Sequence, residues 1–208
     1  MLNQENILDV AIKRFSHFGI HKTTLTEIAE DLAVSKQALF YHYADKQSLV
    51  MAVEDKIVNE YIQVMNDECM IAGTLREALY KMIEIRSYFF EKYYMLATQL
   101  ELSDPNLSAD RINAVKEKLL LKQNDLFVLI FNKGIANGEL NSMPPAKTRA
   151  VILETLSALA MCFRHKTIIP EMHVFREILD RQKEVMDLFY HGLKNLYGSG
   201  SNCRNVNR

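Results

Sequence analysis

Apolar residues in this chain recur mostly three and four positions apart, and no alternating run of apolar and polar residues persists. This spacing is typical of amphipathic helices, whereas alternation is typical of strands. We therefore predict an all-α fold of about nine helices. Two of these helices are short and lie within residues 24–43, and the others cover residues 4–18, 46–69, 74–94, 95–102, 108–136, 146–166 and 171–197.

The low content of turn-forming residues favours the same interpretation. The chain has only 7 glycines and 4 prolines among its 208 residues. A sheet sandwich of this length needs many tight turns, and glycine and proline supply their backbone angles. The length is sufficient for one large or two small domains with a substantial core.

The most specific pattern lies in residues 24–46. Thr24, with Glu27 three residues later, has the pattern of a capping box at a helix start. Ala33 and Val34 supply a tight turn, and Ser35 is a good N-cap for the next helix. This arrangement predicts a helix-turn-helix, whose second helix enters the major groove of DNA.

Charge restricts how such a domain could bind DNA. The whole chain has a net charge of −1, and its first fifty residues hold five basic against six acidic side chains. Most nucleic-acid-binding domains carry a basic surface. DNA affinity must therefore come from the positions of a few cations and from helix N-termini.

The motifs of common enzymes are missing from the sequence. It has no glycine-rich phosphate loop, no GxSxG and no HExxH. Cys69, Cys162 and Cys203 lack metal-ligand spacing, which indicates reduced thiols. We therefore predict a protein that is not an enzyme and uses no metal or cofactor.

Nothing in the sequence suggests secretion or membrane insertion. The first residues, MLNQENILD, are polar and acidic, unlike a signal peptide. The longest apolar stretch, residues 150–163, is short for a membrane span and contains Glu154. We expect a cytoplasmic protein with no membrane partner.

An ordered run of residues near the N-terminus resembles the TetR family of bacterial transcriptional regulators. The matching segments are Ile7-Leu8-x-x-Ala11-x-x-x-Phe15-x-x-x-Gly19, Thr23-Thr24-x-x-x-Ile28-Ala29 and Leu32-x-Val34-Ser35-x-x-x-Leu39-Phe40-x-His42-Tyr43-x-x-Lys46-x-x-Leu49. Ala33 stands where the family usually has glycine, and Phe40 where it usually has tyrosine.

The resemblance implies a three-helix DNA-binding domain at residues 1–48, with the helix-turn-helix at about 24–43. A larger helical domain at 49–197 would then bind an effector and form the dimer. The segment 198–208 is expected to be disordered because it is polar and of low complexity.

Ten residues are predicted to contact double-stranded operator DNA. Lys46 is expected at the phosphate backbone, while Lys36 and Gln37 suit the edges of guanine and adenine. The full set is Thr24, Thr26, Ser35, Lys36, Gln37, Ala38, Phe40, Tyr41, His42 and Lys46. Capping, solvated or core positions are the alternative for each of them.

A band of methionine and aromatic residues is the candidate pocket for a small, mostly apolar effector. Family resemblance makes the band a pocket wall, and an ordinary core is the alternative. Arg86 either pairs with Glu84 or Glu91 or binds an anionic ligand. The candidate residues are Met65, Met82, Arg86, Phe89, Phe90, Tyr93, Tyr94, Phe127, Phe131 and Met161.

The last two helices carry more apolar surface than one bundle would bury. In the resembling family such helices form a homodimer, which would place two recognition helices one DNA turn apart. We therefore expect a homodimeric, ligand-responsive repressor. An effector-independent structural DNA-binding protein, an activator of the same fold and an enzyme containing a helix-turn-helix remain alternatives.

Overall fold

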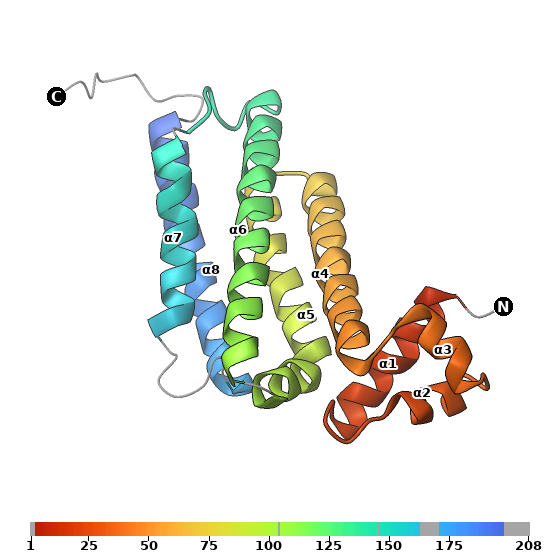
Figure 1. Cartoon of the computed structure of the whole chain (residues 1–208). Helices are drawn as coiled ribbons and strands as arrows, with labels where there is room; N and C mark the ends of the chain where they lie inside the picture. Colours follow the sequence, from red (N-terminus) through yellow and green to blue (C-terminus); the bar gives the residue numbers. More distant parts are fainter. Residues whose placement is uncertain (1–2, 104, 145, 163–170, 198–208) are drawn as a thin grey trace. The chain divides into compact units, whose positions relative to one another are not determined.

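The structure is a computed structural model that describes residues 3–103, 105–144, 146–162 and 171–197 (Figure 1). Across these ranges it contains eight helices and no strand, which confirms the all-α fold. In chain order the helices are α1 (Gln4–Phe18), α2 (Leu25–Asp31), α3 (Lys36–His42), α4 (Lys46–Ile71), α5 (Leu75–Ser103), α6 (Pro105–Ala136), α7 (Ala146–Cys162) and α8 (Met172–Tyr197).

The structure corrects the predicted helix boundaries at two places. The predicted helices 74–94 and 95–102 are one helix, α5, because no glycine or proline interrupts the chain between them. Helix α6 begins at Pro105 instead of residue 108, in keeping with the preference of proline for a first helical turn. The predicted end of α7 beyond residue 162 and the tail 198–208 lie outside the described residues.

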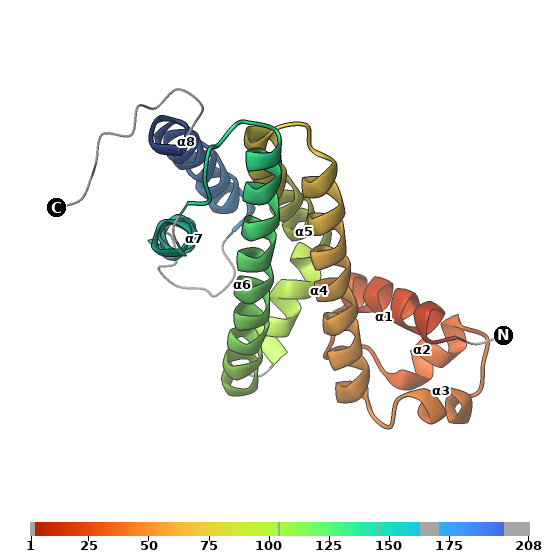
Figure 2. The ribbon, with the colours of Figure 1, turned by 90° about the horizontal axis from the view of Figure 1, so that it is seen from above.

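The chain forms two compact units. The first unit comprises residues 1–61 and 89–116, and the second comprises residues 62–88 and 117–208. Helices α4, α5 and α6 are continuous and contribute segments to both units (Figure 2). Our division at residues 48 and 49 is a functional one and stays a prediction. No helix of the described ranges is long and apolar enough to cross a membrane.

The N-terminal part of the first unit is held by a small apolar core. Ile7, Ala11 and Phe15, each four residues apart, place one face of α1 in this core, where all three are fully buried. Ile28 of α2 and Leu39 of α3 are fully buried in the same cluster. Four-residue spacing places these α1 side chains on one helix face, and burial of that face stabilises the unit.

The turn between α2 and α3 is a Schellman motif with an unusual residue at its left-handed position. Ala33 has φ of +54°. The Val34 N–H donates to the Ala29 carbonyl and the Ala33 N–H to the Glu30 carbonyl, both at 3.0 Å. This pattern satisfies carbonyls at the end of α2, and glycine is the residue that usually adopts its left-handed backbone angles.

The second unit packs α5, α6, α7 and α8 around a larger core. Fully buried side chains include Leu79, Phe127 and Phe131. Gln182 of α8 is also buried, and both polar atoms of its amide have a partner: its Nε2 donates to the Leu156 carbonyl at 2.6 Å and its Oε1 accepts from Arg86 at 3.2 Å. A buried amide is costly unless it is hydrogen-bonded, so these contacts fix α5, α7 and α8 together.

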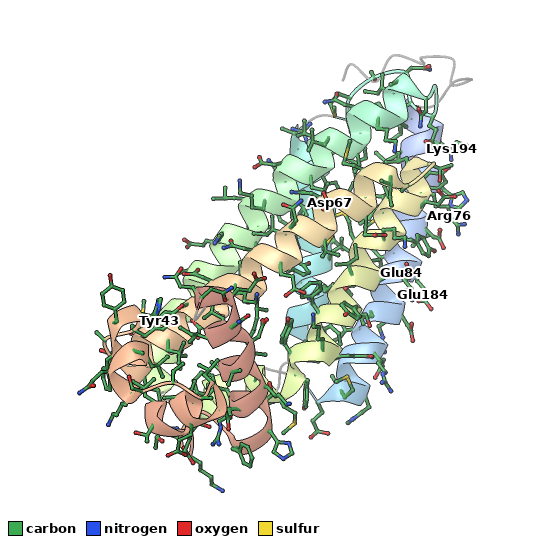
Figure 3. All side chains as sticks on the ribbon, turned by 90° about the vertical axis from the view of Figure 1, so that its right-hand side faces the viewer. Tyr43, Asp67, Arg76, Glu84, Glu184 and Lys194 are labelled. Atoms are coloured by element: carbon green, nitrogen blue, oxygen red, sulfur yellow. The ribbon has the colours of Figure 1, made fainter. Side chains whose placement is uncertain are left out.

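Polar contacts across the second unit further define how α5 meets its neighbours. Asp187 of α8 accepts hydrogen bonds from Tyr80 and, at 3.0 Å, from Arg76 Nε. Figure 3 labels Arg76 on α5. Lys133 of α6 donates to the carbonyls of Met70 and Ala72, which closes the end of α4. Lys133 thus satisfies carbonyls that the end of α4 leaves without intrahelical partners.

Ala33→Gly is expected to stabilise the protein by about 0.5–1 kcal/mol, because relief of left-handed strain exceeds the entropy that glycine adds to the unfolded chain. Gly138 offers a matched control: it occupies the same position of a second Schellman motif, with φ of +73° and open space where a Cβ would be. Gly138→Ala should destabilise by a similar amount. Chemical denaturation of both variants measures the effect, and a lower stability of Ala33→Gly would contradict the strain argument.

Candidate nucleic-acid interface

The helix-turn-helix predicted at residues 24–43 is formed by α2 and α3. The predicted capping box begins α2: the Glu27 N–H donates to Thr24 Oγ1 at 3.2 Å, and the Thr24 N–H donates to Glu27 Oε2 at 2.7 Å. The Thr24 N–H and then the Thr24 hydroxyl donate to the Glu27 carboxylate and hold its pKa below its usual value. Ser35 caps α3 by accepting from the Ala38 N–H at 3.2 Å. Both predicted caps are confirmed.

One side of α3 is anchored and the other is exposed. Leu39 is fully buried and Tyr43, labelled in Figure 3, is nearly so. Tyr41 is 89% exposed, and Lys36 and Gln37 are exposed at the first turn. The buried residues therefore hold the helix while it presents polar and aromatic side chains to solvent.

The remaining predicted DNA contacts lie near this exposed surface. Phe40 is exposed rather than in the core, and the Lys36 ammonium lies 5.4 Å from the centre of its ring. Ala38 and His42 are half-buried on α3. Thr24 and Thr26, at the start of α2, are exposed. Only Lys46 has surroundings that differ from the expectation.

Lys46 binds backbone carbonyls. Its ammonium donates to the carbonyl oxygens of Ile20, His21 and Thr23 at 3.0, 3.3 and 3.2 Å. An ammonium has three N–H donors, so all of them have partners. Lys46 thus fastens the connection that follows α1 to the start of α4, a role that sequence reasoning missed because nothing in the sequence shows where three loop carbonyls converge.

Asp45 confirms the third predicted cap. Its carboxylate accepts from the Ser48 N–H at 2.7 Å, and this donor holds the pKa of the Asp45 carboxyl below its usual value. The cap therefore fixes the first turn of α4, where the adjoining Lys46 binds the connection that follows α1.

Arg14 is a second cation that pairs within the protein. Its Nη2 donates to Asp31 at 3.1 Å, and its Nη1 lies 3.3 Å from Glu27 Oε1, so α1 and α2 are joined. Hydrogen bonding from Arg14 holds the pKa of the Asp31 carboxyl below its usual value. Two of the five basic residues counted near the N-terminus, Arg14 and Lys46, therefore have internal partners, while Lys13, Lys22 and Lys36 are exposed.

The predicted effector residues are divided between the two compact units. Met65, Met82, Phe127 and Phe131 are buried in the second unit, where Arg86 is half-buried. The first unit contains buried Phe89 together with half-buried Phe90, Tyr93 and Tyr94. The side chain of Met161 lies outside the described part of the structure. Low exposure is common to core residues and to ligand-enclosing residues, so burial alone assigns none of them.

Arg86 contacts a residue that the sequence did not suggest. The expected partners were Glu84 or Glu91 on the same helix, or an anionic ligand. The structure shows the guanidinium donating to Gln182 of α8. The two residues are 96 positions apart, so helical spacing gave no signal of this contact.

A pocket of about 570 Å³ is present in the first unit. Its lining residues come from α1, α4 and α5, and they are Glu5, Asp9, Ile12, Lys56, Glu60, Lys92 and Tyr93. Of the predicted effector residues only Tyr93 is among them. The lining is mainly charged, in contrast to the apolar pocket that we predicted.

Two observations concern metal ligands and thiols. Within the described ranges, no group of three or more His, Cys, Asp or Glu side chains could hold a metal ion. Cys69 is buried, and burial raises the pKa of its thiol to about 12. A thiol with this pKa stays protonated at neutral pH and is a poor nucleophile.

Comparison with known sequences agrees with this geometry. A sequence profile described as "Bacterial regulatory proteins, tetR family" matches residues 7–53. The chain is 30% identical over 137 residues to the HTH-type transcriptional regulator QacR of Staphylococcus aureus, covering 65% of this chain and 72% of that protein. It is 23% identical over 137 residues to the fatty acid metabolism regulator protein of Bacillus subtilis, covering 64% and 69%.

A third relative and two solved structures extend the comparison. The chain is 26% identical over 129 residues to the biofilm operon icaADBC HTH-type negative transcriptional regulator IcaR of Staphylococcus epidermidis, covering 59% and 69%. A transcriptional regulator from Cytophaga hutchinsonii has the same fold, with a TM-score of 0.73, 23% identity and 91% and 97% coverage. A TetR-family structure from Mesorhizobium loti has a TM-score of 0.63, 16% identity and 94% and 96% coverage.

Proteins of this family bind operator DNA and work as dimers. The family profile covers the whole helix-turn-helix, and the similarity to QacR continues beyond it into the second unit. The chain therefore belongs to the TetR family of bacterial regulatory proteins and is a DNA-binding transcriptional regulator, not an enzyme.

Proposed function

We propose that this protein is a repressor that binds its operator as a homodimer and is released by a small, mostly apolar effector. It would act in the cytoplasm, where bacterial operators lie. One relative is named a negative transcriptional regulator, which supports repression. The observation that carries the proposal is the packing of α3: Leu39 is buried, while Lys36, Gln37 and Tyr41 are exposed.

Different side chains on this surface have different roles in the proposal. Gln37 suits bidentate hydrogen bonding to adenine, and Lys36 suits the acceptors of guanine. Thr24, Thr26, Tyr41 and His42 would bind phosphates and set the register on DNA. Because few exposed cations are available, non-specific affinity should be low and should depend only weakly on salt, since the salt dependence scales with the number of phosphate contacts.

Dimerisation through α7 and α8 is supported by apolar side chains that the second unit leaves uncovered. The two helices pack on each other (Figure 1). Phe175, Ile178 and Met186 of α8 are buried. Leu188 is nevertheless 74% exposed, and Leu196 of α8 and Val151 of α7 are also exposed. A second copy of the chain would cover these residues in a two-fold interface.

For the effector, we propose a site among the buried apolar residues of the second unit, which include Met82, Phe127 and Phe131. Methionine adapts to different ligand shapes, and aromatic rings supply a large apolar surface. Ligand would favour a conformer in which the spacing of the recognition helices no longer matches the operator. An operator affinity that no small molecule changes would instead favour an effector-independent regulator, and increased transcription on binding would identify an activator.

Lys46→Met should weaken binding to operator and to unrelated DNA by the same factor, because the lysine supports the whole domain through the Ile20, His21 and Thr23 carbonyls. A contact with a phosphate would require the ammonium to give up one of these carbonyls. Gel shifts should be run across a salt series with an operator selected from random duplexes. Loss of one phosphate contact lowers the slope of log affinity against log salt by about 0.9. An unchanged slope with a lower melting temperature would restrict Lys46 to its carbonyl contacts.

Gln37→Ala is the matched variant for base reading. It should weaken operator binding by about 1–3 kcal/mol, lower discrimination at one base pair and leave unrelated DNA unaffected. Equal losses on operator and unrelated DNA would contradict the assignment of Gln37 to a base.

Leu188→Lys should convert the dimer to monomers, because a two-fold interface loses the buried leucine twice, about 3 kcal/mol or more in total. Sedimentation velocity measures the change. Leu121→Lys on α6 is the control, since Leu121 is 69% exposed and outside the proposed interface. A Leu188→Lys variant that remains dimeric would contradict the α7–α8 interface.

A further inference from the structure

The charged pocket of the first unit joins α1, α4 and α5 through two sets of ion pairs. On one side, the Lys56 ammonium of α4 lies 3.3 Å from Asp9 and 3.6 Å from Glu5, both on α1. On the other side, Glu60 of α4 contacts α5. Lys56 and Glu60 are four residues apart and therefore occupy the same face of α4.

Both oxygens of the Glu60 carboxylate have donors on α5. Lys92 donates to Oε1 at 2.8 Å, and the Tyr93 hydroxyl donates to Oε2 at 2.9 Å. Burial works to raise the pKa of the Glu60 carboxyl, but donation by Lys92 and Tyr93 outweighs it and holds that pKa below its usual value. Glu60 is therefore a fully engaged anion whose partners both come from α5.

The two sets of ion pairs differ in their exposure to solvent. The side chains of Glu5 and Asp9 are 74% and 61% exposed, whereas those of Lys56 and Glu60 are 24% and 34% exposed. Ion pairs with strongly exposed carboxylates contribute little, because water competes for both charges. If Glu60 lost its α5 donors, it would become a better partner for Lys56 than either carboxylate on α1.

We propose that Lys56 is a positioning residue that exchanges partners, pairing with Glu5 and Asp9 in the DNA-binding form and with Glu60 once α5 withdraws Lys92 and Tyr93. The open pocket provides the space in which the lysine side chain moves. The exchange removes the charged contacts between α1 and α4, while the apolar contacts in their shared core remain. It thereby loosens the support that the N-terminal part of α1 gives to the helix-turn-helix.

This exchange of partners by Lys56, called the relay below, rests on the proposed function in one respect. Effector binding along α5 would be the event that withdraws Lys92 and Tyr93 from Glu60. Phe89 and Tyr93 on the same helix stack with ring centres 5.9 Å apart, and Phe89 meets Tyr61 of α4 at 5.3 Å. A shift of α5 at these rings would therefore act directly on the contact with Glu60. The exchange itself can be tested without any effector.

Lys92→Met mimics the withdrawn state by removing one donor from Glu60. We expect about tenfold weaker binding to the selected operator and faster hydrogen–deuterium exchange in residues 4–12. Adding Glu60→Gln should restore affinity to within about threefold of wild type and slow the exchange again, because a neutral amide does not attract Lys56. Glu60→Gln alone should stay within threefold of wild type.

Lys81→Met is the matched control, because Lys81 of α5 also pairs with a carboxylate of α4, Glu68, at 3.5 Å but outside this pocket. It should leave operator affinity and exchange in α1 unchanged. A double variant no better than Lys92→Met, or a Lys92→Met variant equal to wild type, would overturn the relay.

The two readouts separate this proposal from the proposed function. Hydrogen exchange in α1 needs no DNA, so an exchange pattern that follows Lys92→Met and reverts with Glu60→Gln supports the relay even if no operator is found. If the wild type binds operator but no variant changes hydrogen–deuterium exchange in α1, the relay is contradicted and the proposed function is not.

Discussion

A seven-residue recognition helix depends on tertiary packing. Helices of this length are unstable in isolation because nucleation is costly and few hydrogen bonds follow. Helix α3 exists because Leu39 and Tyr43 fix one side of it in the core with α1 and α2, and because Ser35 and the turn at Ala33 set its start. The positions of the exposed Lys36, Gln37 and Tyr41 therefore depend on this small core.

Electrostatics in the DNA-binding region is used mainly for internal support. Arg14 joins α1 to α2, and Lys46 joins the connection after α1 to the first turn of α4. A domain of nearly neutral charge therefore has few cations for phosphates, and its recognition depends on geometry. The proposed exchange of partners by Lys56 would act on this geometry, because loosening α1 would shift every residue that α3 presents.

The sequence predicted those features that local chemistry determines. The caps at Thr24, Ser35 and Asp45 follow from short-range hydrogen bonding, and the buried face of α1 follows from its spacing, so both were readable. The partners of Lys46 and Arg86 were not, because each lies more than twenty positions away in the chain. The charged pocket was missed for the same reason, since its residues come from three separate helices.

The central claim is that two copies of α3 read one operator from a single dimer. Hydroxyl-radical footprinting of the wild-type protein on an operator selected from random DNA tests it most directly. The account predicts two protected segments related by two-fold symmetry, with centres about one helical turn apart, about 34–36 Å, or a multiple of that distance. A single protected segment, or two segments without symmetry, would contradict it.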